Sequence, residues 1–342
     1  MSVISTPFQM RGATLIELMI ALVLGLLLTL AIGNIFLGSR QSYAMVDGLS
    51  RLQENGRFAL RRIARDIREA DYMGCGSSLS SYAINNTLNN ATDFRWNFSR
   101  GIEGFEATSS TAWSPTVDAS ISAPLGGRDI IVVRRVADTP TTVTAHPGGT
   151  PPGSANIQVA PGSDLKQFDI VMVSDCVSAA IFEITSANPG TSGSLAHNTG
   201  SVSQGPGNAT QALGREYTNG GITKVSTIVY YIGTGTGGGP ALFRAEGANP
   251  AQELVEGVED MQILYGEDTD GDRDADRYVA ANTVADWSDV ISVRVSLLLH
   301  SLKDGLNDTP IAYTYNGATV TPTDRRLRQV FTATLNLRNR SL

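Results

Sequence analysis

The chain has 342 residues, of which 42% are hydrophobic and 17% charged, a composition that excludes a disordered chain and allows one large domain or two. Its charge is uneven, because residues 1–70 hold eight Lys and Arg against five Asp and Glu, whereas the remaining 272 residues hold 18 against 28. This acidic excess argues against nucleic-acid binding through bulk electrostatics.

An apolar run covers residues 13–37, after a short N-terminal segment. As a helix it would extend about 37 Å at about 1.5 Å per residue, which is enough to cross a hydrocarbon core of about 30 Å. The apolar core of a secretory signal peptide is shorter, roughly 7–15 residues, and no A-x-A-like cleavage site follows Leu37. The sequence therefore predicts a membrane-spanning helix over residues 13–37.

One carboxylate, Glu17, lies inside this run, where a charge costs about 2.5–3.5 kcal/mol on insertion scales. The segment RGATLIE, from Arg11 to Glu17, resembles the type IV prepilin signal, in which a short basic leader ends in glycine and is cut on the cytoplasmic side. The resemblance implies a leader of residues 1–12, cleavage after Gly12 by a prepilin peptidase, and N-methylation of Ala13, which stands where the family usually has an aromatic residue.

The resemblance also implies a role for Glu17, which in the family pairs with the N-terminal amine of a neighbouring subunit. Two buried opposite charges offset each other's desolvation only when they meet. Such a pair, between Glu17 and the new amine at Ala13 of a neighbour, would set the register of assembly.

Residues 38–73 keep a helical period beyond the membrane run. Apolar or small residues recur at steps of three and four, and the arginines lie mostly off that stripe. The pairs Arg62–Asp66 and Arg65–Glu69 have the i,i+4 spacing of surface ion pairs. Glycines at 74 and 76 then predict the helix end. The stripe consists of Met45, Leu49, Leu52, Gly56, Leu60, Ile63, Ile67 and Ala70.

Residues 74–342 are predicted to form a β-rich head. Eight runs are enriched in β-branched residues, and many of them alternate with period two. No helical pattern stands between them to make βαβ units, so we expect an α+β fold with a largely antiparallel sheet. Long loops are expected at 77–127, 138–156, 186–222 and 303–324. The eight predicted strands are 128–137, 169–175, 179–185, 225–233, 241–247, 261–266, 289–301 and 329–339.

The two cysteines, Cys75 and Cys176, lie 101 residues apart and form no CxxC pair. In an oxidising periplasm a disulfide between them would stabilise the fold by about 2–4 kcal/mol. Two unrelated buried thiols are the alternative.

Four stretches together resemble the PilW family of type IV pilus minor pilins. They are Leu52–Gly76, the strand leading into Cys176, Val255–Asp272 and Arg325–Arg340. The resemblance implies a pilin-like fold and a structural role in a priming or tip complex. Expected partners are other minor and major pilins and the inner-membrane assembly machinery. The head would lie in the periplasm before assembly and at the cell surface or in the pilus afterwards.

An acidic segment in the head offers a candidate metal site. Alternating carboxylates are the ligands that Ca²⁺ prefers, but Arg273 and Val279 stand where an EF-hand loop has its glycine and its glutamate. A solvated acidic loop between strands is the alternative. The candidate ligands are Asp268, Asp270, Asp272, Asp274 and Asp276.

No motif predicts an enzyme. The glycine run Gly233–Pro240 lacks the Lys-Ser/Thr and the helix of a phosphate-binding loop, which favours a hairpin connection. His146, His197 and His300 have no zinc-ligand spacing and are predicted to be loop or surface residues. No cofactor is expected apart from the calcium candidate.

Three alternatives to a pilus minor pilin remain. A minor pseudopilin of type II secretion shares the prepilin signal and differs in its gene neighbourhood. A pilus-tip adhesin with a calcium-binding loop would bind a surface ligand, and a membrane-anchored enzyme would need convergent titratable residues in a pocket.

Overall fold

A computed structural model describes residues 14–75, 83–137, 139–147 and 155–340. Its first element is a single helix, α1 (Leu15–Arg68), of 54 residues. The helix ends six residues before Gly74, so the predicted end was wrong by more than a turn. Glu69 is the C-cap, and its amide bonds back to the carbonyl of Arg65.

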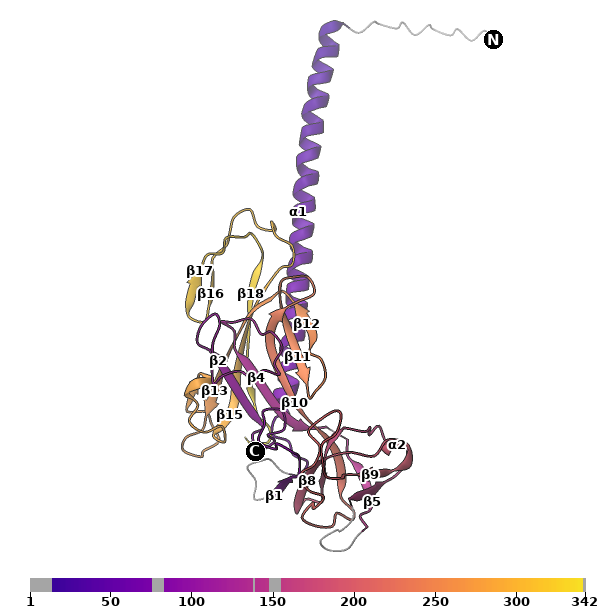
Figure 1. Cartoon of the computed structure of the whole chain (residues 1–342). Coiled ribbons are helices and arrows are strands. Elements are labelled where there is room, and N and C mark those ends of the chain that lie inside the picture. Colours follow the sequence, from indigo (N-terminus) through magenta and orange to yellow (C-terminus); the bar gives the residue numbers. More distant parts are fainter. Residues whose placement is uncertain (1–13, 76–82, 138, 148–154, 341–342) are drawn as a thin grey trace, which may run out of the picture.

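The two halves of α1 have different surroundings (Figure 1). All residues from Thr14 to Tyr43 are exposed, whereas from Leu52 onward one face is buried against the head. The predicted stripe is confirmed from Leu52 to Ala70, while Met45 and Leu49 are 42% and 40% exposed because the helix leaves the head there. Among the described residues, α1 is the one helix long and apolar enough to cross a membrane.

A four-stranded antiparallel sheet supports the buried half of α1. Its order is β14 (Arg277–Val279), β13 (Val258–Glu267), β15 (Val290–His300) and β18 (Arg328–Asn336). At Gly56 the helix approaches β18 so closely that a Cβ atom would overlap the ring of Phe331. A side chain at this position would therefore push helix and sheet apart.

A second, larger sheet runs the length of the head. Its central path is β1, β8, β7, β10, β4, β2 and β3, with β11, β12, β5, β6 and β9 paired off that path. All pairs are antiparallel except the parallel pair β1–β8. The bounds are β1 (Ala83–Asn86), β2 (Ile102–Ala107), β3 (Trp113–Ser114), β4 (Ile130–Val136), β5 (Thr141–Ala145), β6 (Asn156–Val159), β7 (Ile170–Ser174), β8 (Ser178–Glu183), β9 (Ser194–Ala196), β10 (Gly221–Thr234), β11 (Pro240–Glu246) and β12 (Gln252–Glu256).

Strand β10 links two lobes of the head (Figure 1). Its first residues, from Gly221, pair with β7 and β5, and its later residues, from Val225, pair with β4 and β11. The lobe far from the membrane helix has its own core from β5 to β9, together with the short helix α2 (Pro189–Ser192). A 3-10 helix η1 (Ala281–Thr283) and the hairpin β16 (Tyr313–Tyr315) and β17 (Ala318–Val320) complete the head.

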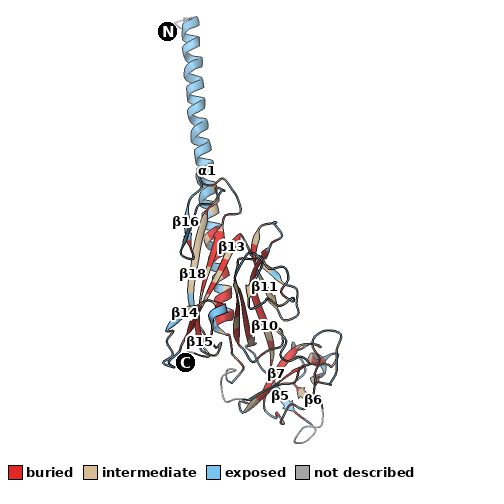
Figure 2. Cartoon of the chain, turned by 60° about the vertical axis from the view of Figure 1, so that its left-hand side comes forward, coloured by how far each residue is buried: buried red, intermediate tan, exposed pale blue. Residues whose placement is uncertain are grey.

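The main core lies where α1 meets both sheets. Side chains from α1, β4, β10, β13, β15 and β18 form one buried cluster, which Figure 2 shows as the red region around the lower part of the helix. The apolar stripe of α1 thus folds with the head, while the described residues from Thr14 to Tyr43 stay exposed.

All eight predicted strands are confirmed, and the glycine run is the β10–β11 connection. The segments predicted as long loops were partly wrong, because they contain short strands such as β1, β2, β5 and β16. These strands are polar or only a few residues long, with sequences such as AINN and TTVTA. β1, β2 and β5 are held by the stronger strands β8, β4 and β10, which their own composition does not indicate, whereas β16 pairs with β17 in a separate hairpin.

Candidate functional site

Glu17 caps the start of α1. Its Oε2 accepts hydrogen bonds from the Thr14 amide at 3.0 Å and the Thr14 hydroxyl at 2.9 Å, and the Thr14 hydroxyl accepts from the Glu17 amide at 3.4 Å. This reciprocal arrangement is a capping box. The carboxylate remains exposed at the helix end. Gly12 and Ala13, the predicted cleavage and methylation positions, lie outside the described residues.

The exposed half of α1 presents small residues among its large apolar ones. A Cβ atom at Gly25 or Gly33 would have no neighbour within 4 Å. Small residues let two membrane helices approach closely. This surface therefore has the composition and the openness that packing against another helix requires.

A buried ion cluster holds α1 against the head. Asp66 has no exposed surface, and its Oδ2 lies 2.9 Å from Nε of Arg244 while its Oδ1 lies 3.5 Å from Nη2 of Arg135. The Tyr230 hydroxyl also donates to Oδ2. Burial and the Asp66 carboxylate raise the pKa of Tyr230 well above its usual value, so the hydroxyl keeps the proton that it donates.

The predicted pair Arg62–Asp66 is wrong, because Asp66 faces β4, β10 and β11. Its position is one residue from Ile67 and three from Ile63, on the buried face of the helix. The pair Arg65–Glu69 is confirmed at 3.5 Å. A charge on the apolar face of α1 was the sequence signal for this cluster, and its partners come from strands distant in sequence.

The C-terminus of the described chain is fixed to the end of α1. Nε of Arg340 lies 2.8 Å from Oδ2 of Asp71, and both side chains are almost fully buried. The Asn339 amide donates to the carbonyl of Ala70 at 3.1 Å. The segment that follows β18 is therefore bound to the segment that follows α1.

Cys75 and Cys176 form a disulfide, with their Cα atoms 5.1 Å apart. Cys75 follows the helix end, and Cys176 lies in the turn between β7 and β8. The bond therefore ties the lobe far from the membrane helix directly to the segment after α1.

The acidic segment is the loop between β13 and β14. Carboxylate oxygens of Asp268, Asp270 and Asp276 come within 4.8 Å of one another. Asp272 and Asp274 do not belong to this group, and Asp272 instead accepts the amide of Asp274. The loop is thus an acidic hairpin loop in which three of the five predicted ligands converge.

Hydrogen bonds inside this loop already hold all three of the converging carboxylates, and Asp270 accepts the amide of Asp272 at 3.2 Å. Asp276 accepts from the amide and hydroxyl of Thr269, which lowers its pKa, and Asp268 accepts from the amides of Gly271 and Arg273. Three carboxylates, each offering one oxygen, leave at least half of the roughly six to eight oxygen ligands of Ca²⁺ to water or backbone.

If the loop binds calcium, the full chain in detergent should melt at a higher temperature in millimolar Ca²⁺. At ten times the dissociation constant the gain is about 1.4 kcal/mol. The measurement is a melting curve followed by circular dichroism, and the Asp268→Asn/Asp276→Asn variant should lose the increase. An unchanged melting curve of the unmodified chain would exclude the site.

His146 and His197 lie in loops, as predicted, directly after β5 and β9, but both are buried rather than on the surface. His146 is 3% exposed and His197 is fully buried, while His300 is partly exposed. Nδ1 of His146 accepts the Tyr217 amide at 3.0 Å, and the His197 ring packs against Phe182. Burial lowers the pKa of His197 to about 4, so the ring is neutral near pH 7 and acts as part of the core.

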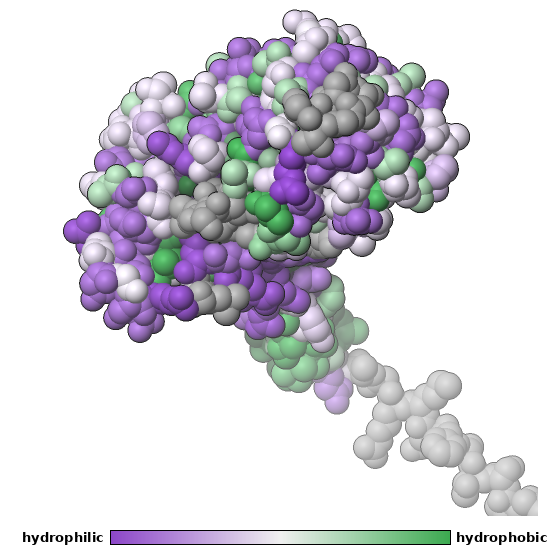
Figure 3. Space-filling model, turned by 90° about the horizontal axis from the view of Figure 1, so that it is seen from below, coloured by the Kyte–Doolittle hydropathy of each residue, from purple (hydrophilic) through white to green (hydrophobic). Residues whose placement is uncertain are grey.

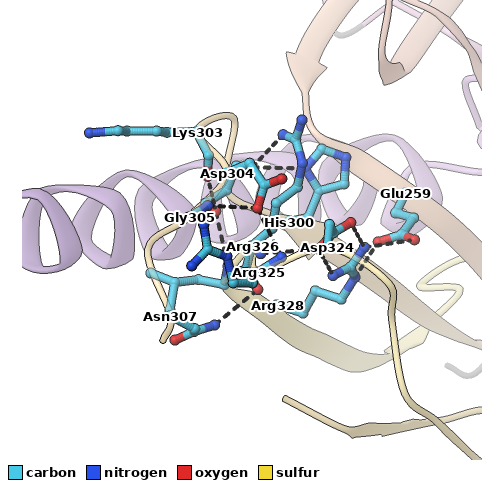
Figure 4. Close-up of polar contacts among 12 residues, drawn as sticks. Glu259, His300, Lys303, Asp304, Gly305, Asn307, Asp324, Arg325, Arg326 and Arg328 are labelled. Carbon is cyan, nitrogen blue, oxygen red and sulfur yellow. Dashed lines mark hydrogen bonds and ion pairs between the residues drawn. The ribbon is translucent and has the colours of Figure 1, made fainter. Parts of the chain in front are cut away.

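A charged pocket of about 420 Å³ lies beside β18, and Figure 4 shows the ion pairs at its edge. Arg328 lies 2.7 Å from both Asp324 and Glu259, and Arg326 donates to the carbonyls of Ser301 and Leu302. The Arg328 guanidinium lowers the pKa of Asp324. These groups are paired with one another, so they fix the loops before β18 and leave no poised acid or base among them.

The helix and the two sheets together define an α+β protein with an apolar N-terminal helix that associates with a membrane. The family model described as type IV pilus-assembly protein W (PilW) matches residues 229–339, from within β10 to just past β18. The resemblance to the PilW family is confirmed over this part of the chain, and it supports involvement in type IV pilus assembly. No curated protein and no solved structure matches the chain significantly.

The matched range contains the four-stranded sheet that binds α1, the acidic loop and all of the residues that line the charged pocket except Arg128. The stretch Leu52–Gly76 and the strand leading into Cys176 lie outside it.

Proposed function

We propose that the chain is a minor pilin, which enters a type IV pilus or its priming complex through α1. The observation that carries the proposal is the division of α1 into an exposed apolar half and a half buried in a head whose sheet falls in the PilW match. The exposed half fits a bilayer before assembly and other pilin helices afterwards. The head would lie in the periplasm and later at the tip, because its bulk suits a tip better than a tightly packed shaft.

In this proposal the peptidase cuts after Gly12, and the new amine at Ala13 is methylated. Glu17 then has two roles. Within its own chain it caps α1, and its exposed carboxylate is available to the N-terminal amine of a neighbouring pilin. The other partners would be minor and major pilins and the inner-membrane assembly machinery.

The test is deletion of the gene, complemented by variants and scored by counting surface pili. The deletion, Gly12→Val and Glu17→Ala should each reduce piliation strongly, and Gly12→Val should leave an uncleaved precursor visible on a gel. Normal piliation in all three would contradict the proposal.

Two further variants separate the roles of Glu17. Glu17→Gln keeps a side chain that can complete the capping box but removes the charge, whereas Thr14→Ala removes the cap and keeps the charge. Pairing with a neighbouring amine predicts that Glu17→Gln fails and Thr14→Ala assembles pili. The reverse result would assign Glu17 to helix capping alone.

The convergence of Asp268, Asp270 and Asp276 favours a second candidate, a tip adhesin whose acidic loop binds calcium. This reading predicts that the Asp268→Asn/Asp276→Asn variant still assembles pili but fails to attach. A minor pseudopilin of type II secretion would instead be encoded among secretion genes.

A further inference from the structure

One loop of the head reaches the level at which the membrane segment of α1 ends. Nε2 of Gln41 lies 3.4 Å from Oδ1 of Asp308, in the loop between β15 and β16. Gln41 stands four residues beyond Leu37, which is about 6 Å along a helix. The headgroup layer adds about 5–7 Å on each side of the hydrocarbon core. If that core ends at Leu37, Asp308 lies at headgroup depth.

Two aliphatic side chains are exposed beside this loop. Ile311 is 56% exposed and Val320 is 42% exposed. Val320 pairs with Tyr313, two residues after Ile311, so the two aliphatic side chains lie near the same end of the β16–β17 hairpin. Figure 1 shows the loops around this hairpin as the part of the head that extends farthest along α1.

The loop is fixed to the head and to the helix. Leu306 fits against Gly48, where a Cβ atom would stand 2.7 Å from its Cδ1. The Asn307 amide donates to the carbonyl of Arg325, and its side chain donates to that of Arg326, each at 3.1 Å (Figure 4). The level of the loop relative to α1 is therefore set by packing and hydrogen bonds.

Residues of α1 at the same level suit a membrane interface. Arg40 and Tyr43 are exposed, Tyr43 by 76%, and both residue types favour the boundary between lipid and water. Arg40 and Asp308 carry opposite charges, so the net charge of the pair is zero and gives no preference for anionic over zwitterionic lipid. The opposite end of the head, viewed in Figure 3, is mostly hydrophilic.

We propose that, while the chain is a single subunit in the membrane, the loop Asp308–Ile311 rests on the phospholipid headgroups, with Ile311 entering the interface and Val320 beside it. The occupant of this apolar surface is the outer leaflet of the bilayer that α1 spans. The inference rests on the proposed membrane-spanning role of α1. The contact fixes the orientation of the head before assembly and is lost when the subunit leaves the membrane.

The test uses the full chain in phosphatidylcholine vesicles with an environment-sensitive fluorophore on one introduced cysteine. The structure holds no free cysteine among its described residues, so the label goes to the new thiol. Labels at Ile311→Cys and at Tyr43→Cys, the marker on the helix, should show blue-shifted emission and quenching by headgroup nitroxide lipids. A label at Thr191→Cys, exposed in α2 at the far lobe, should show neither.

The role of Ile311 is tested with the label at Val320→Cys. Adding Ile311→Asp should reduce quenching of that label, and unchanged quenching would assign Ile311 no part in the contact. If the protein floats with the vesicles but the Ile311 label resembles the Thr191 label, the contact is overturned and the proposed function stands. If the protein does not float with the vesicles, the spanning helix and the contact both fail.

Discussion

Replacing Asp66 with asparagine is expected to lower the free energy of unfolding of the head by about 3–5 kcal/mol, because it removes one partner from a buried ion cluster. Arg244 and Arg135 are 8% and 12% exposed at their side chains, and Asp66 is fully buried between them. Without the carboxylate, two cations are left facing an amide. The measurement is denaturant unfolding of the full chain in detergent, followed by tryptophan fluorescence.

Asp47 provides the matched control on the same helix. It also pairs with an arginine, Arg51, at 3.0 Å, but their side chains are 64% and 73% exposed. Exposed pairs of this kind contribute about 0.3–0.5 kcal/mol, so Asp47→Asn should shift the unfolding midpoint very little. Equal effects of the two substitutions would show that burial of Asp66 does not determine its contribution.

Removing the disulfide with Cys75→Ser and Cys176→Ser is expected to destabilise the fold by about 4 kcal/mol. The reason is that the disulfide closes a loop of roughly a hundred residues in the unfolded chain. The closed loop contains β1 to β7, including most strands of the lobe far from the membrane helix. That lobe should therefore unfold at a lower denaturant concentration, as measured by hydrogen exchange and by fluorescence.

A reductant provides the control for the disulfide. It should bring the unmodified chain to the stability of the double variant and should leave the double variant unchanged. Either single substitution should have nearly the full effect, because one cysteine cannot form the bond alone. Equal unfolding midpoints of oxidised and reduced protein would contradict the prediction.

The long apolar elements could be predicted from sequence because their pattern is strong on its own. β4 reads IIVVRRV and β15 reads VISVRVSLLLH, and both were identified near their observed bounds. Short polar strands such as β1 and β5 were missed, because they depend on pairing with β8 and β10 rather than on their own residues.

Charged and titratable residues were the least predictable part. Spacing alone assigned Asp66 to Arg62, but burial against β4, β10 and β11 assigned it to Arg135 and Arg244. In the same way, His146 and His197 carry no motif, yet the far lobe encloses both. For the acidic segment, the hairpin between β13 and β14 selected three of five aspartates.

The sequence by itself determined that an apolar helix opens the chain, that its apolar stripe continues beyond the membrane run, and that a largely antiparallel head follows. These features follow from local periodicity and composition, which a short stretch of chain carries without help. Only the tertiary structure decided which charges pair with α1, how far the Asp308 loop reaches along it, and that Gly56 must lack a side chain beside Phe331. Those facts depend on contacts between residues up to 275 positions apart, and no local pattern encodes them.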